Sequence, residues 1–174
     1  MKMNWGGKLL DFYTLVHELG HYVHAVKTME SQPFIYQDYP SFISEVASTT
    51  AENISQFYLI RNSESKEEKL YHIEQYLDNI TLMVCNSTMM AEFELKLYQI
   101  VENGGSLSTD QLCSLYGKFL KEYYGPDVTI DQTDTYGWLE WPHYYLDYYL
   151  YSYATSFSAS IQIASNIENE GKPA

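Results

Sequence analysis

Two histidines and a glutamate near the start of the chain form the pattern His17-Glu18-Leu19-Gly20-His21. Residues four apart on a helix project from one face, one turn apart. Both imidazoles can therefore bind one Zn²⁺ at about 2.0–2.1 Å. Glu18 lies about 100° around the helix axis from His17, so it stays outside the ligand set but reaches a water beside the metal. Two ligands and one general base predict a site for metal-assisted hydrolysis.

A third ligand is needed, because catalytic zinc usually keeps three protein ligands and one open position. A longer zinc motif would place a glycine at position 24 and a histidine at position 27, where this chain has His24 and Lys27. His24 lies on the same helix face as His17, but seven residues span about 10 Å along the axis. We therefore expect His24 behind the ligands or in the wall of a cleft.

Glu45 is the next candidate ligand, on the helix expected to follow. Ser48 and Glu52 lie three and seven residues later and share its face of that helix. A carboxylate on a helix is ordinarily solvated. The residues alone therefore leave two interpretations open, a third ligand and a surface glutamate.

Two other interpretations of the motif also remain open. The paired histidines can be structural, with their glutamate on the helix surface. Di-iron helical bundles use paired Glu-x-x-His segments, and this chain contains two, Glu18–His21 and Glu140–His143. Pro142 disfavours a continuous helix through the second pair, and His17 would have no role in such a bundle.

The elements that position these residues are expected to be helices. Apolar residues recur at helical spacing from near Lys8 until just before the sequence Ser31-Gln32-Pro33. Strand signals are nearly absent, so the fold class is predicted to be mainly α. The other expected helices cover residues 41–62, 66–103, 108–125 and 143–169, with an irregular loop over 126–142.

Length and composition narrow the class of protein. The chain has 174 residues, enough for one core, and is 45% apolar and 19% charged, as a folded protein is. Its formal net charge of -13 argues against a nucleic-acid partner, which would require clustered Lys and Arg. No apolar run is long enough to span a membrane, and no signal peptide is recognisable. Two sparse cysteines, Cys85 and Cys113, fit the reducing cytoplasm.

Several segments resemble, in the right order, those of the oligoendopeptidase F family, which belongs to the thimet oligopeptidase-like zinc metallopeptidases. They are the active-site stretch Thr14–His24, the third-ligand segment Glu45–Glu52, and the later sequences Ala91–Glu94, Tyr123–Gly125 and Trp141–Thr155. The resemblance implies a helical zincin-type catalytic domain, with one helix for the HExxH motif and a second for the third ligand. It also implies a zinc metalloendopeptidase that hydrolyses short oligopeptides.

The family pattern assigns roles to residues around the motif. Glu45 is implied as the third ligand of one Zn²⁺ per chain, together with His17 and His21. Glu18 is implied as the general base that accepts a proton from the attacking water. Ser48 and Glu52 match positions that support the site.

The tyrosine-rich segment near the C-terminus corresponds to the part of the family that binds substrate and stabilises the oxyanion. By that match we expect His143, Tyr148 and Tyr151 to take this role. Tyr148 and Tyr151 would share one face of the helix predicted over 143–169, and Tyr145 is the reserve candidate. The alternative for most of these tyrosines is an aromatic core stripe.

The family's enzymes are several times longer than this chain. The resemblance therefore implies that residues 1–174 form a single catalytic domain matching the C-terminal portion, without the N-terminal region that walls the cleft. Expected partners are short peptides, and either that N-terminal region or a second copy covering the exposed cleft. A truncated form that binds zinc without turnover stays an open alternative.

Overall fold

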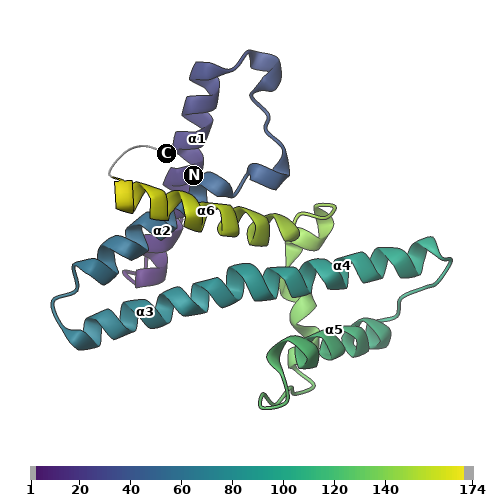
Figure 1. The fold of residues 1–174 in the computed structure, drawn as a ribbon. Helices are drawn as coiled ribbons and strands as arrows, with labels where there is room; N and C mark the ends of the chain where they lie inside the picture. The colour runs from purple at the N-terminus through teal and green to yellow at the C-terminus, as the bar shows by residue number, and fades with distance from the viewer. Residues whose placement is uncertain (1–2, 171–174) are drawn as a thin grey trace. The chain divides into compact units, whose positions relative to one another are not determined.

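The computed structural model describes residues 3–170 and is built almost entirely from helices (Figure 1). This confirms the mainly α fold class, and the described part contains no strand. The α-helices are α1 (Leu9–Ser31), α2 (Val46–Arg61), α3 (Lys66–Ile80), α4 (Ser87–Glu102), α5 (Thr109–Tyr124) and α6 (Tyr151–Glu170). Shorter 3-10 helices cover Phe34–Tyr36, Ser41–Ile43, Asp134–Glu140 and Pro142–Tyr145, and a π-helix covers Thr81–Asn86.

Within residues 3–170, no helix is both long and apolar enough to span a lipid bilayer.

The chain divides into two compact units. The first contains residues 1–80 and 155–174, and the second contains residues 81–154. Each is described by itself below. The prediction of a single catalytic domain over 1–174 stays a prediction.

Helix α1 of the first unit, Leu9–Ser31, agrees with the predicted range to about one residue at each end. The carboxylate of Asp11 accepts hydrogen bonds from the backbone N–H groups of Gly6 and Lys8, at 2.9 and 2.8 Å. These contacts fix the chain where the helix begins. The helix ends at Ser31, before Gln32 and the proline that cannot continue it.

Helix α2 packs closely against α1 in the same unit. A methyl group built on Gly20 of α1 would lie 2.6 Å from Cα of Ser48 and 2.8 Å from the carbonyl oxygen of Ala47. Only a glycine permits so close an approach of the two backbones. The predicted helix over 41–62 proves shorter, since a 3-10 turn over Ser41–Ile43 comes first and α2 begins at Val46.

The interior of the first unit is unusually polar. Side chains of α2 that are almost fully buried include Ser48, Thr49 and Asn53. The amide of Asn53 donates to the carbonyl of Thr49 and to Oγ of Ser160 on α6, both at 2.9 Å. Because these buried groups are hydrogen-bonded, their desolvation costs little free energy. The bond between Asn53 and Ser160 also fixes the orientation of α2 relative to α6.

Helix α4 and helix α5 form the apolar core of the second unit, which contains Met89, Met90, Phe93, Tyr116, Phe119, Leu120 and Leu150. Ser108 and Gln111 cap α5 reciprocally, and Gly125 ends it with a φ of 79°. The bounds of α5 agree with the helix predicted over 108–125 to within one residue. The single helix predicted over 66–103 is interrupted by the π-helix Thr81–Asn86, which apolar spacing does not reveal.

The last helix differs most from its prediction. It begins at Tyr151 rather than near residue 143, because Asp147 and Tyr148 adopt positive φ angles that no α-helix contains. The expectation that Tyr148 and Tyr151 share a helix face is therefore wrong.

Candidate metal centre

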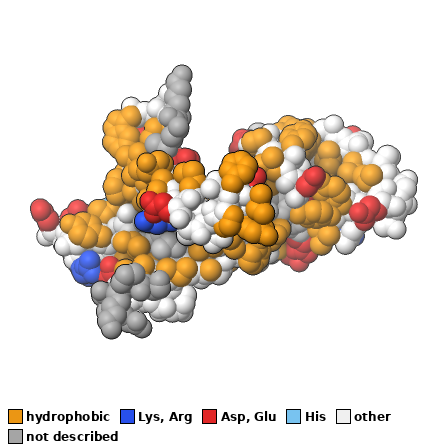
Figure 2. Space-filling view, turned by 90° about the horizontal axis from the view of Figure 1, so that it is seen from above, with side chains coloured by type: hydrophobic (Ala, Val, Ile, Leu, Met, Phe, Trp, Pro, Cys, Tyr) orange, Lys and Arg blue, Asp and Glu red, His pale blue; other side chains and the backbone are white. Residues whose placement is uncertain are grey.

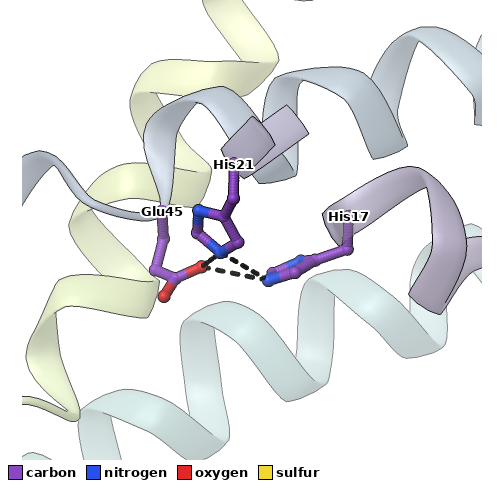
Figure 3. Close-up of side chains that lie close together, drawn as sticks. All are labelled: His17, His21 and Glu45. Atoms are coloured by element: carbon purple, nitrogen blue, oxygen red, sulfur yellow. Dashed lines mark hydrogen bonds and ion pairs between the residues drawn. The ribbon is translucent and has the colours of Figure 1, made fainter. Parts of the chain in front are cut away.

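Three side chains of the first unit point their ligand atoms at one another (Figure 3). His17 and His21 come from successive turns of α1, and Glu45 is the residue just before α2. Nε2 of His17 lies 3.0 Å from Nε2 of His21 and 3.2 Å from Oε2 of Glu45. The remaining separation, between Nε2 of His21 and Oε2 of Glu45, is 3.3 Å. The three atoms form a nearly equilateral triangle.

This triangle fits a zinc ion. Ligands at about 2.0–2.1 Å in a tetrahedral arrangement stand about 3.3 Å apart, close to the observed separations. Two imidazoles and one carboxylate are a common donor set of catalytic zinc, and they leave a fourth position for water. Within residues 3–170, no other group of three His, Cys, Asp or Glu side chains gathers in this way.

Partners behind the ligands fix their orientation. Nδ1 of His17 lies 2.5 Å from Oε1 of Glu52, so the ring donates its Nδ1–H to this carboxylate and directs Nε2 to the site. The other oxygen of Glu52 accepts a hydrogen bond from the amide of Asn79 on α3, at 3.4 Å. Oγ of Ser48 donates to Oε2 of Glu45 at 2.9 Å. Ser48 and Glu52, the two residues expected to support the site, thus each contact one candidate ligand, and Asn79 is a contact that sequence analysis missed.

The site is strongly negative. Glu45 is only 3% exposed, and Glu52 only 7%. Burial lowers the pKa of His17, but hydrogen bonds to Glu45 and Glu52, and the charges of both, outweigh it and raise that pKa to about 10. Two buried carboxylates therefore favour a positive charge at this point, which a divalent cation supplies with geometry to match.

Glu18 lies between the two histidines in sequence and is half-buried on α1. Its carboxylate makes no hydrogen bond or ion pair with the residues that the structure describes, and it is outside the ligand triangle. A carboxylate next to the ligands but not engaged by them suits proton transfer to and from a water.

Gly20 determines how closely the two ligand-bearing segments approach. We expect Gly20→Ala to push α2 away, because the new methyl group meets backbone atoms rather than a flexible side chain. The expected loss is about 1–3 kcal/mol in the free energy of unfolding, with a lower zinc affinity. Denaturant unfolding and competitive zinc titration measure the two effects.

Gly117→Ala provides the matched control, since this glycine also lies inside a helix, α5, and the added methyl meets only the side chain of Thr135. Zinc affinity should be unchanged in this variant. Equal zinc affinity in the Gly20 and Gly117 variants would show that the close approach of α1 and α2 does not shape the site.

His24 does not contact the ligand atoms. Its ring stacks on Tyr39, with centroids 4.0 Å apart, and its Nδ1 is buried without a hydrogen bond to a described residue. It lines an apolar groove of about 750 Å³ between α1 and α2, together with Val16, Leu19, Val23 and Ile54. Sequence analysis expected His24 either behind the ligands or in the wall of a cleft, and the structure has it in the wall of this groove.

The C-terminal candidates belong to the second unit. Nε2 of His143 lies 3.2 Å from the hydroxyl of Tyr153, and the ring of Tyr149 stacks on the imidazole, with centroids 5.8 Å apart. Tyr148 instead stacks on Tyr98, and Tyr151 is 37% exposed. Sequence analysis did not single out Tyr149 and Tyr153 as the tyrosines that contact His143, because the break before α6 removes the helical register on which it relied. The reserve candidate Tyr145 is 89% exposed.

The di-iron interpretation fails on the geometry of its second pair. Glu140 ends one 3-10 helix and His143 lies in the next, with Trp141 between them at φ −110° and ψ 91°. The two side chains therefore do not project from one α-helix, as such a bundle requires.

Comparison with known proteins shows which family the chain resembles. The whole chain, residues 1–174, matches the model of Peptidase family M3. The chromosomal oligoendopeptidase F of Lactococcus lactis subsp. cremoris is 39% identical over 167 residues, which cover 96% of this chain and 28% of the relative. Oligopeptidase PepF of Bacillus subtilis (strain 168) is 39% identical over 172 residues, which cover 99% and 26%.

Two solved structures resemble the fold. The crystal structure of oligoendopeptidase-F from Enterococcus faecium has a TM-score of 0.72 at 36% identity and covers 93% of this chain and 29% of that one. The structure of a putative peptidase from Chlamydophila abortus has a TM-score of 0.78 at 33% identity and covers 96% and 28%. The chain thus spans just over a quarter of the length of the curated relatives it matches.

Proposed function

The chain belongs to peptidase family M3, as its resemblance to oligoendopeptidase F predicted, and we propose that it carries the zinc site of a metalloendopeptidase acting on short oligopeptides. The observation that carries the proposal is the triangle of His17, His21 and Glu45, whose edges fit tetrahedral zinc. Several relatives are named oligoendopeptidases, which supports peptide hydrolysis as the reaction.

His17, His21 and Glu45 would hold the zinc ion, which when bound would supply Lewis-acid activation of the attacking water and of the scissile carbonyl. Glu18 accepts the proton of that water and passes it to the leaving amine. Glu52 holds the ring of His17 in one tautomer, and Ser48 holds the carboxylate of Glu45. Glu18, Glu52 and Ser48 thus have different proposed roles: Glu18 transfers the proton, and the other two each orient one ligand.

His143 and a tyrosine hydroxyl are proposed to bind the substrate and stabilise the oxyanion. The contact between His143 and Tyr153 supports Tyr153 for this role alongside the expected Tyr148 and Tyr151. Through its hydroxyl group, Tyr153 can hold the imidazole of His143 in one orientation toward the substrate.

Peptide cleavage before and after metal removal tests the proposal. We expect the chain to cleave a quenched short peptide, to lose this activity on treatment with a chelator, and to regain it with one equivalent of zinc. Cleavage that persists without metal would contradict a zinc mechanism. One bound zinc without any cleavage would favour the inactive, zinc-binding alternative.

The cytoplasm is the proposed compartment. Cys85 and Cys113 form no disulfide, in agreement with a reducing environment. Acidic side chains far outnumber basic ones on the face drawn in Figure 2, beside many hydrophobic ones. This charge fits peptide substrates better than nucleic acid. We also predicted that the exposed cleft is covered, either by the N-terminal region of the family's enzymes or by a second copy of this chain. This stays a prediction.

A further inference from the structure

Two consecutive residues of the second unit, Asp147 and Tyr148, hold positive φ angles of 38° and 58°. They lie between the 3-10 helix Pro142–Tyr145 and α6. A bulky side chain such as tyrosine rarely adopts this left-handed conformation, because its Cβ crowds the backbone. A strained turn of this kind persists only where surrounding groups hold it.

Two residues of α4 hold this turn. The backbone N–H of Tyr148 donates to Oε1 of Glu94 at 2.8 Å. The hydroxyl of Tyr98 donates to Oδ1 of Asp147 at 3.0 Å, and its ring stacks on that of Tyr148 with centroids 4.7 Å apart. Glu94 and Tyr98 are four residues apart, so they lie on one face of α4. Both residues of the turn are thus tied to the same helix face.

Glu94 is costly as a core residue. It is 2% exposed, and its Oε2 is buried without a hydrogen-bond partner in the described part of the chain. Burial raises the pKa of this carboxyl group, the N–H of Tyr148 lowers it, and the charge of Asp147 raises it again. An apolar side chain would fill the same space at lower cost. We therefore infer that Glu94 serves to hold the turn at Asp147 and Tyr148 rather than to stabilise the core.

The turn connects the two residues that meet in the proposed substrate-binding cluster. His143 lies before it and Tyr153 after it, and the reversal of the chain brings their side chains to 3.2 Å. If the turn relaxed to an ordinary backbone conformation, the direction of the chain leading to Tyr153 would change. Contacts at this distance do not survive a shift of one or two ångströms.

We propose that Glu94 is a positioning residue for peptide hydrolysis: through the N–H of Tyr148 it holds the left-handed turn that aligns Tyr153 with His143. The proposal rests on the proposed function, because the cluster of His143 and Tyr153 matters to catalysis only if it contacts the substrate. The proposed role of Glu94 requires no contact with the substrate or with a metal ligand.

Glu94→Gln and Glu94→Leu separate the two roles of the side chain, since the amide keeps an acceptor oxygen for Tyr148 and leucine does not. We expect Glu94→Leu to lower kcat by roughly 10- to 100-fold, as misalignment of a catalytic group does, with a zinc content near that of the original chain. Glu94→Gln should stay within about threefold, because the hydrogen bond survives. An equal loss of kcat in both variants, or a parallel loss of zinc, would overturn the positioning role.

Hydrogen exchange of the Tyr148 amide tests the turn without relying on catalysis. Exchange should be at least roughly tenfold faster in Glu94→Leu than in Glu94→Gln. Unchanged exchange in the leucine variant would overturn the proposal whether or not the chain cleaves peptides. Failure of the proposed function appears instead in the unsubstituted chain, as bound zinc without cleavage. If Glu94→Leu does not fold, Glu94→Asp, whose shorter side chain draws the carboxylate away from the N–H of Tyr148, must accelerate the same exchange, and unchanged exchange there also overturns the proposal.

Discussion

Glu18→Gln is expected to lower kcat for a quenched short peptide by on the order of 10²- to 10⁴-fold while zinc stays bound. Glutamine has the shape of glutamate but cannot accept the proton of the attacking water. Because Glu18 lies outside the triangle of His17, His21 and Glu45, its replacement removes no ligand. The loss should affect kcat and kcat/KM together, since the interaction is made in the transition state.

Glu30→Gln is the matched control for this prediction. Glu30 lies on the same helix, and its carboxylate forms an exposed ion pair with Lys27. The control variant should cleave the peptide at the original rate, because exposed pairs contribute little. Unchanged turnover in Glu18→Gln would remove Glu18 as the base, and loss of zinc from that variant would make it a ligand instead.

Glu45→Gln should reduce zinc affinity by roughly 100-fold or more. The carboxylate is the anionic member of the ligand set, it is buried, and Ser48 holds the oxygen that faces both histidines. An amide oxygen is a weaker, uncharged donor for zinc. Competitive titration with a zinc-binding dye measures the change.

Glu52→Gln is the comparison that isolates direct ligation. Glu52 is buried behind His17 and supports its ring without facing the triangle. Loss of such a partner typically costs about 10- to 100-fold in metal affinity, so its effect should be the smaller of the two. A larger effect at Glu52 than at Glu45 would contradict the assignment of the third ligand.

Local signals in the sequence predicted much of the fold. Helix α5 is an example: Ser108 and Gln111 cap its N-terminus, and Gly125 ends it. These signals are local, because each residue forms its contacts with residues close to it in sequence. The end of the last helix nearest His143 could not be predicted in the same way. Its break depends on Glu94, more than fifty residues away in sequence, holding Tyr148 in a conformation that tyrosine alone disfavours.

In the candidate site too, contacts within one helix could be predicted from the sequence, and contacts between helices could not. The spacing of His17 and His21 predicts their convergence, because a helix fixes it. Glu45 comes from a separate segment, and its approach depends on how closely α2 packs against Gly20, so the residues alone left its role open. The support of Glu52 by Asn79 depends on the placement of α3, which no local pattern records.

The zinc content and coordination of the purified chain, measured by metal analysis and zinc X-ray absorption, test the proposed metal site most directly. We expect one zinc per chain, with two imidazole nitrogens and one carboxylate oxygen at about 2.0–2.2 Å and weakened binding in Glu45→Gln. Less than one zinc per chain under saturating metal, or a coordination shell unchanged when Glu45 is replaced, would contradict the assignment of His17, His21 and Glu45 as zinc ligands.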